Sequence, residues 1–357
     1  MVGWMAAIIF SRSSSVSWVT VTPAASMVAF GNFDFVRTNL LFTSTQSQYI
    51  PAYSLYWVLS LTDYYQYTDD SATVGSLLEN ACHKLDSAYA IYDKDLDLRF
   101  YGWDERLGAG FENASCPESQ RAYRMLAIRT WRSFASAMRA YGRNDLAEKY
   151  ERYADQKATA FMAGPEFGAM GVHAAEEAVN AGVGCDTPEQ RERLWRQAFA
   201  DRQKRVSYYP FHQFFILQAM AALGRYEEAL TTLDDCWGGQ LRYGATTFFE
   251  VFRPSWNDAL GPNDAPVNNQ CGYTSFTHPW SAGVTKWLSE QILGIRPLSP
   301  GFTSFEIMPV PAGGLKQISG SVPTPHGIVR ASFDPSKRKA RIRLISIMKV
   351  CKREITR

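Results

Sequence analysis

Glu250 is the only carboxylate in the stretch RYGATTFFEVFRPSWN, and five of the other fifteen residues are aromatic. A group that takes a proton from water is best a carboxylate in a pocket, where apolar walls exclude bulk solvent and raise its basicity. The preceding run, 246–249, predicts a buried strand that ends at this glutamate. An ion pair with Arg242 or Arg253 explains the same residues equally well. Glu250 is therefore a candidate general base, with a structural ion pair as the open alternative.

The Gly-rich stretch FYGWDERLGAGFEN, at 100–113, contains the second candidate acids. Asp104 and Glu105 lie between Trp103 and Arg106, and adjacent side chains of an extended loop point in opposite directions. One acid could then face a ligand while the other pairs with Arg106. A loop in which both acids are solvated or salt-bridged fits as well. Asp104 and Glu105 are thus candidate catalytic acids, and Trp103 and Arg106 are candidate ligand contacts.

A further group of candidates lies around 268–288, where NNQCGYTSFTHPWSAGVTKWL leads into an apolar helix. His278 has no cysteine or histidine partner at metal-ligand spacing, so we do not expect it to bind a metal. It could donate a hydrogen bond to a ligand hydroxyl, or simply cap the helix. Trp280, together with Tyr243 and Trp256, is a candidate aromatic wall for a ligand.

Charge and hydropathy narrow the classes of partner. The 357 residues include 37 basic and 35 acidic side chains, a net charge of +2, which argues against nucleic acid and anionic membranes as partners. No stretch reaches the roughly 20 apolar residues of a membrane span. The N-terminal MVGWMAAIIF lacks a preceding basic residue and makes a poor signal peptide, whereas Asn113 begins a glycosylation triplet compatible with secretion. Localisation stays open.

Cofactor chemistry has little support in the sequence. The six cysteines are scattered without a CxxC pair, which predicts neither a zinc site nor a dense disulfide framework. His173 and His212 fall inside helical patterns, where packed or surface residues are expected. A Gly-rich phosphate loop and a Ser-centred nucleophile elbow are both missing, so nucleotide-dependent chemistry is not expected.

Repeated helical hairpins dominate the chain. In 118–156, apolar residues recur at three- and four-residue steps up to Gly142, after which a second helix begins. The segment 209–236 has the same pattern around Gly224, and 53–92 is a third candidate. Such repeats predict either an α-solenoid or a closed α/α toroid.

The long segments between hairpins decide between these two folds. The stretches 97–117, 164–170 and 237–274 are rich in Gly, Trp and Asn, and loops of such length in a compact fold usually serve a function. Their aromatic side chains are typical of clefts that bind sugars. They favour a toroid with a ligand cleft at its rim. After about residue 295, alternating β-branched and polar residues between Gly and Pro predict a small β-domain.

Several of these segments, taken in order, are similar to one known family. Between about 27 and 335 the chain resembles the α-L-rhamnosidases of glycoside hydrolase family 78, which have a six-hairpin (α/α)6 fold. The resemblance rests on the words VAFGNFDFVRTNL, YSLYWVLSLTDYY, YGWDERLGAGFEN, WGGQLRYGATTFFEVFRPSWN, TSFTHPWSAGVTKWL, LGIRPLSPGF and VPTPHG. It implies inverting hydrolysis of terminal α-L-rhamnosyl linkages, a carbohydrate partner, and no metal or cofactor.

The resemblance also implies roles for individual residues. Glu250 matches the general base that activates water, and His278 matches a position that contacts the sugar. Trp103, Trp256 and Trp280 resemble the aromatic lining of the family's cleft.

One departure affects the expected activity. Where the family has an acidic loop with the general acid, this chain has SSSVSWVTVTPAASMVAF, which contains no carboxylate. We therefore expect a toroid that is incomplete at its N-terminus, and an activity impaired unless Asp104 or Glu105 supplies the proton. A carbohydrate-binding protein without turnover is the main alternative, and an α-solenoid interaction protein is another. The expected domains are an unassigned segment 1–22, the toroid 23–295, the β-domain 296–350 and a tail 351–357.

Overall fold

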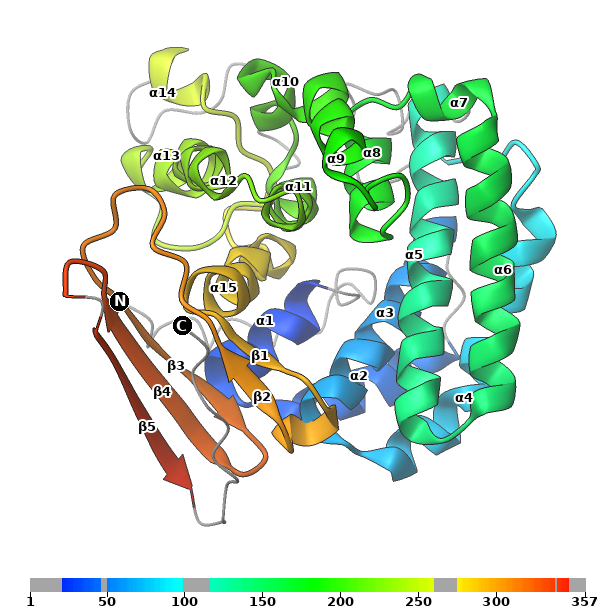
Figure 1. The fold of residues 1–357 in the computed structure, drawn as a ribbon, viewed down its shortest axis with the longest axis horizontal. Helices are drawn as coiled ribbons and strands as arrows, with labels where there is room; N and C mark the ends of the chain where they lie inside the picture. The colour runs from blue at the N-terminus through cyan, green and yellow to red at the C-terminus, as the bar shows by residue number, and fades with distance from the viewer. Residues whose placement is uncertain (1–20, 46–49, 99–115, 260–274, 338, 347–357) are drawn as a thin grey trace.

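The computed structural model describes residues 21–45, 50–98, 116–259, 275–337 and 339–346. Helices fill most of this length, and strands appear only after residue 294 (Figure 1). The helices are α1 (Val21–Phe30), α2 (Phe33–Ser44), α3 (Pro51–Thr68), α4 (Ser71–Ile91), α5 (Pro117–Tyr141), α6 (Asn144–Ala163), α7 (Pro165–Gly168), α8 (Val172–Asn180), α9 (Pro188–Leu194), α10 (Arg202–Val206), α11 (Pro210–Ala222), α12 (Tyr226–Leu233), α13 (Gly239–Arg242), α14 (Trp256–Ala259) and α15 (Gly283–Trp287). Short π- or 3-10-helical turns are η4 (Trp195–Phe199), η5 (Asp234–Gly238), η7 (Pro279–Ala282), η8 (Leu288–Ile292) and η9 (Pro300–Phe302).

The inner helices form a closed ring. Around it, α1 contacts α3, α3 contacts α5, α5 contacts α8, α8 contacts α11, α11 contacts α15, and α15 returns to α1. Most inner helices are followed by an outer helix that packs against them, as α4 packs on α3, α6 on α5 and α12 on α11. The prediction of a toroid built from helical hairpins is confirmed, and a ring that closes on itself is not the open α-solenoid of the alternative. That the toroid is incomplete at its N-terminus stays a prediction.

The turns between paired helices lie where the sequence predicts them. Gly142 ends α5 with φ +90° and Gly224 follows α11 with φ +75°, a backbone region that glycine enters without steric cost. Between α3 and α4 the same conformation is taken by Asp69, and the next residue, Asp70, caps α4 by accepting a hydrogen bond from the Thr73 amide at 3.0 Å.

The core lies between the inner and outer helices. The α5 pattern buries one face of the helix, including Trp131 and Phe134, against the neighbouring helices. Inner helices α3 and α11 are buried almost all round, which explains why their sequences have little amphipathic pattern. Trp57, Trp131 and Trp287 are among the largest fully buried side chains.

A small β-region follows the ring, as predicted. Strands β1 (Ile295–Pro297) and β2 (Phe305–Ile307) pair antiparallel, and β3 (Ile318–Thr324), β4 (Gly327–Asp334) and β5 (Lys339–Ser346) form an antiparallel sheet in that order. Strand β3 packs against α1 and η8, so the sheet lies beside the ring's closing helices at one edge of the molecule (Figure 1). The expected domain boundaries remain a prediction.

Gly294 connects the last inner helix to β1 and has φ +74°. A Cβ at this position would overlap the backbone of Met308, whose amide donates a 2.9 Å hydrogen bond to the Gly294 carbonyl. We expect Gly294→Ala to lower the free energy of unfolding by about 3 kcal/mol or more, measured by urea denaturation. Gly314→Ala is the matched control, because its φ is also positive, +66°, but no atom lies within 4 Å of the added Cβ. A similar loss in both variants would contradict the steric explanation.

None of the helices in the described ranges combines the length and the low polarity that a membrane crossing requires.

Candidate functional site

Glu250 lies in an irregular segment, not at the end of a strand. Residues 245–255 contain no strand, so that part of the sequence prediction was wrong. Hydrogen bonds to residues just before η7 fix the segment instead. The Glu250 amide donates to the Ser275 carbonyl at 2.8 Å, and the His278 amide donates to the Phe248 carbonyl at 2.7 Å. These two contacts pair the stretch 248–250 with 275–278 and bring Glu250 next to His278.

The Glu250 carboxylate is held by one backbone amide and faces one imidazole. Its Oε2 accepts a hydrogen bond from the Ser275 amide at 2.9 Å, and its Oε1 lies 3.7 Å from Nε2 of His278. The ion pairs considered from the sequence are not formed, because Arg242 pairs with Asp234 and Arg253 donates to the Tyr209 hydroxyl. One carboxylate oxygen is therefore fixed while the other stays available.

His278 both caps the following helix and faces Glu250. Its Nδ1 accepts a hydrogen bond from the Trp280 amide at 3.3 Å, so the proton of the neutral ring is on Nε2, the nitrogen nearest the carboxylate. Burial lowers the pKa of His278 to about 4. Near neutral pH the side chain is therefore an uncharged donor aimed at the space beside Glu250.

Burial also changes the basicity of Glu250. Only 15% of its side chain is exposed, and this desolvation raises the pKa of the carboxyl group, while the bond from the Ser275 amide opposes the rise. The pKa of Tyr53 is likewise raised, first by burial and then by the charge of Glu250, which places this tyrosine near the carboxylate. Sequence reasoning missed Tyr53, because this residue lies in a uniformly apolar helix pattern.

The predicted aromatic residues occupy two different places. The Trp280 indole donates to the Glu250 carbonyl at 3.0 Å, and its ring centroid lies 4.5 Å from His278 and 5.2 Å from Phe211. Tyr243 and Trp256 instead pack in a second apolar cluster, whose other members are Tyr209, Phe249, Val251 and Phe252. Because Phe249 and Val251 belong to that cluster, it anchors the segment on both sides of Glu250. The Tyr243 and Trp256 rings are almost completely buried in it.

The remaining candidates, Trp103, Asp104, Glu105 and Arg106, lie outside the described residues. Their predicted roles as acids and ligand contacts remain predictions.

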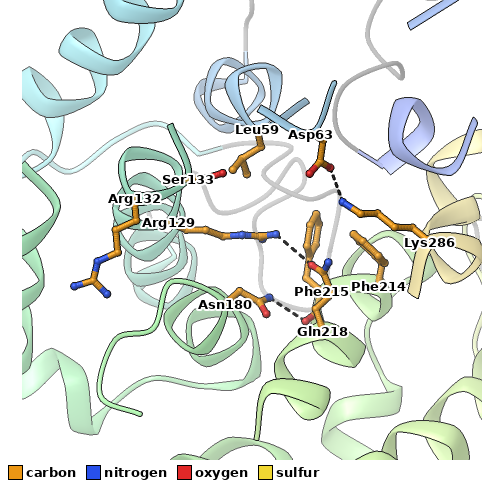
Figure 2. A pocket seen from close by; sticks show the side chains of 10 residues that line it. All are labelled: Leu59, Asp63, Arg129, Arg132, Ser133, Asn180, Phe214, Phe215, Gln218 and Lys286. Atoms are coloured by element: carbon orange, nitrogen blue, oxygen red, sulfur yellow. Dashed lines mark hydrogen bonds and ion pairs between the residues drawn. The ribbon is translucent and has the colours of Figure 1, made fainter. Parts of the chain in front are cut away.

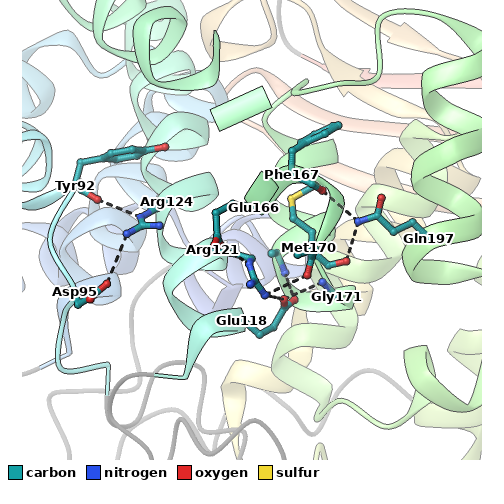
Figure 3. A network of polar contacts seen from close by, with 12 residues as sticks. Tyr92, Asp95, Glu118, Arg121, Arg124, Glu166, Phe167, Met170, Gly171 and Gln197 are labelled. Carbon is teal, nitrogen blue, oxygen red and sulfur yellow. Dashed lines mark hydrogen bonds and ion pairs between the residues drawn. The ribbon is translucent and has the colours of Figure 1, made fainter. Parts of the chain in front are cut away.

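The start of α8 is fixed by polar side chains from neighbouring elements (Figure 3). The Glu118 carboxylate, from the first turn of α5, accepts hydrogen bonds from the amides of Gly171 and Ala174, both at 2.8 Å. Gln197 donates to the carbonyls of Phe167 and Met170 at 3.2 and 2.9 Å. A carboxylate at a helix N-terminus is favourable to the helix dipole, so this network holds the α7–α8 connection at one end of the ring.

A separate cavity of about 340 Å³ lies further along the inner helices (Figure 2). Asp63, which lines it, is ten residues beyond Tyr53 in α3, about 15 Å along the helix axis. Three of its lining residues belong to charged pairs: Lys286 donates to Asp63 at 2.7 Å, and Arg129 donates at 2.9 Å to Glu177, which is not part of the lining. The other lining residues are Leu59, Arg132, Ser133, Asn180, Phe214, Phe215 and Gln218. The sequence did not indicate this cavity, because its residues are spread over five helices.

Comparisons by sequence find rhamnosidases. A family model described as the bacterial alpha-L-rhamnosidase C-terminal domain matches residues 294–345. An alpha-L-rhamnosidase of Formosa agariphila is 32% identical over 98 residues, and one of Alteromonas sp. is 33% identical over 98 residues. These alignments cover 28% and 27% of this chain and 10% of each relative.

Comparisons by structure find the same group over a longer stretch. The GH78 family rhamnosidase of Bacillus sp. GL1 matches with a TM-score of 0.66 and 20% identity, covering 89% of this chain and 36% of that one. The Streptomyces avermitilis alpha-L-rhamnosidase complexed with L-rhamnose matches with a TM-score of 0.67 and 16% identity, covering 89% and 32%. The chain thus spans about a third of the length of these relatives. Over part of its sequence the chain is therefore similar to α-L-rhamnosidases, and over most of its length its fold is similar to that of solved α-L-rhamnosidases.

Proposed function

We propose that this chain is an α-L-rhamnosidase-type glycoside hydrolase in which Glu250 is the general base. The observation that carries the proposal is the pairing of a largely buried carboxylate with a neutral imidazole, 3.7 Å apart, in a ring of helices shared with rhamnosidases. The substrate class is taken from those relatives, one of which was solved with L-rhamnose.

Each contact of Glu250 suits proton removal from water. The Ser275 amide fixes Oε2, so Oε1 keeps its lone pairs for a water molecule. Burial raises the pKa of this carboxyl group, and a carboxylate with a raised pKa is a stronger base than an exposed one. The Nε2 proton of His278 can hydrogen-bond a sugar hydroxyl beside that water, which would orient the ring for attack on its anomeric carbon.

The proposed stereochemistry is inversion. In such hydrolysis a base activates water on one face of the sugar while an acid, roughly 6.5–9.5 Å away, protonates the leaving oxygen. Asp104 and Glu105 are the proposed sources of that proton. Without a working acid, cleavage depends on how readily the leaving group departs unprotonated.

Two aryl rhamnosides test both parts of the proposal. We expect the chain to hydrolyse 2,4-dinitrophenyl α-L-rhamnoside, whose leaving group needs no proton, and to spare the matching α-L-arabinoside and α-D-mannoside. A much slower reaction on the 4-nitrophenyl rhamnoside would indicate that the acid is impaired. Proton NMR should show β-L-rhamnose as the first product. Rhamnose binding without release of either phenol would favour a carbohydrate-binding protein instead.

The pH profile of the reaction should follow Glu250. Because burial raises the pKa of this carboxyl group, kcat/KM should fall on the acid side at a pH above the ordinary glutamate value of about 4.3. The sign follows from the role, since a base works only when deprotonated and activity must rise with pH through its pKa. His278 stays neutral until about pH 4 and should not set this limb. An acid limb at or below the ordinary value would contradict the assignment.

A further inference from the structure

Two of the chain's five histidines meet a glutamate in the ring's interior. His173 and Glu176 are three positions apart in α8, so they project from the same face of that helix, and His212 faces them from the adjacent α11. All three side chains are fully buried. Their potential ligand atoms all lie within 4.8 Å of one another.

The group is compact and has the chemistry of a metal site. Nδ1 of His212 lies 2.9 Å from Oε1 of Glu176, and the two imidazole centroids are 4.0 Å apart. Two imidazole nitrogens and one carboxylate oxygen form a donor set that zinc and other first-row divalent ions accept. Pairs of His and Glu at three-residue spacing on facing helices are also a recurrent way to build metal sites inside helical bundles.

The adjacent glutamate provides a comparison. Glu177 is also fully buried, but it points to Arg129, which donates to it at 2.9 Å, and to the Tyr56 hydroxyl. The buried ion pair with Arg129 therefore explains why Glu177 can be buried. Glu176 is directed at imidazole rings, which suit a metal ligand set better than a salt bridge.

The distances suit three corners of a tetrahedral site, in which a water molecule would be the fourth ligand. Bonds of about 2.0–2.1 Å place neighbouring ligand atoms about 3.4 Å apart, so only small side-chain rotations are needed from the present separations. We propose that His173, Glu176 and His212 bind one Zn²⁺ ion that joins α8 to α11. The burial indicates a structural ion that is taken up as the chain folds, not one that exchanges freely.

The position of this site implies a structural role for the ion, not a role in hydrolysis. The His212 ring lies 5.2 Å from Phe211, whose ring lies 5.2 Å from Trp280, and Trp280 holds the Glu250 carbonyl. The ion would therefore fix the spacing of two inner helices behind the candidate base. It would not touch the substrate.

Metal content tests the proposal directly. The full chain, with no histidine tag and no exposure to chelators, should contain one equivalent of zinc after dialysis, measured by plasma mass spectrometry. Chain produced with Co²⁺ should show the visible d–d bands of a tetrahedral site. Glu176→Gln and His212→Asn should each lose at least nine-tenths of the metal and the bands. His83→Asn is the matched control, since His83 is exposed on α4 and its loss should change neither.

Two further measurements keep the test decisive if a variant folds poorly. Zinc removed from the wild-type chain by a chelator in denaturant should leave a refolded apo form whose Tm is several degrees lower, and zinc should restore it. Absence of stoichiometric metal from both the purified and the zinc-refolded chain would overturn the proposal, as would full metal content in both variants. None of these readouts needs catalysis, so they stand whether or not the chain hydrolyses rhamnosides.

Discussion

Replacing Glu250 with Gln should abolish most turnover of aryl rhamnosides while the protein stays folded. The amide is isosteric, and its oxygen can still accept the hydrogen bond from the Ser275 amide, but it cannot take a proton from water. Loss of general-base assistance typically lowers the rate about 10²–10⁴-fold. We expect kcat to fall within this range, with KM little changed, and far-UV circular dichroism and Tm to match the wild type.

Azide makes this test specific for the proposed role. A small anion that needs no deprotonation can attack the anomeric carbon in place of water, so it should restore turnover in Glu250→Gln and yield a rhamnosyl azide of inverted configuration. Glu151→Gln is the control, because Glu151 lies on outer helix α6 and forms its ion pair with exposed Arg139. Unchanged activity in Glu250→Gln, or loss of activity in the control, would show that Glu250 is not the base.

Replacing Arg129 with Met should lower the free energy of unfolding far more than replacing the exposed Arg139 with Met. Arg129 donates to Glu177 at 2.9 Å, and that carboxylate is fully buried. Removing one partner of a buried pair leaves an uncompensated charge and typically costs about 3–5 kcal/mol. Urea denaturation at neutral pH should show a loss of this size. The double variant Arg129→Met, Glu177→Gln should recover much of it, because the remaining charge is removed.

The pH dependence of this variant follows from the state of Glu177. Burial already raises the pKa of that carboxyl group, and Arg129 opposes the rise, so deleting the arginine should raise the pKa further. A native state that binds protons more readily than the unfolded chain gains stability as pH falls, so the deficit should shrink toward pH 5. Arg139→Met, which breaks an exposed pair with Glu151, should change stability little at any pH. Equal losses in both arginine variants would contradict the role of burial.

The sequence predicted the fold well because its signals are local. The spacing of apolar residues in α5 and the glycines at 142 and 224 depend on neighbours within a few positions, and these elements appear as expected. Glu250 and His278 were also candidates from local composition. Their proximity depends on hydrogen bonds between 248–250 and 275–278, which no periodic pattern encodes.

What the sequence missed depends on partners far along the chain. Arg129 and Glu177 are 48 residues apart, and Lys286 and Asp63 are 223 residues apart. In the sequence of a helix, such residues cannot be distinguished from charged residues on the protein surface. Their pairing becomes visible only in the folded ring. The strand expected before Glu250 failed for the opposite reason: β-branched and aromatic residues favour extended backbone, but packing of Phe249 and Val251 into the cluster with Tyr243 gave the segment an irregular path.

The contact between α1 and α15 joins the first and last members of the ring, which are more than 250 residues apart in the chain. Such distant pairing has a high loop-closure cost and is expected to form late in folding. Tyr53 lies early in the chain and Glu250 lies late in it. We expect the two side chains to come near each other only after the ring has closed. A nascent or partly assembled chain would then hold well-formed hairpins yet be unable to cleave a glycoside, so the gain of activity during refolding should lag behind the recovery of helical signal.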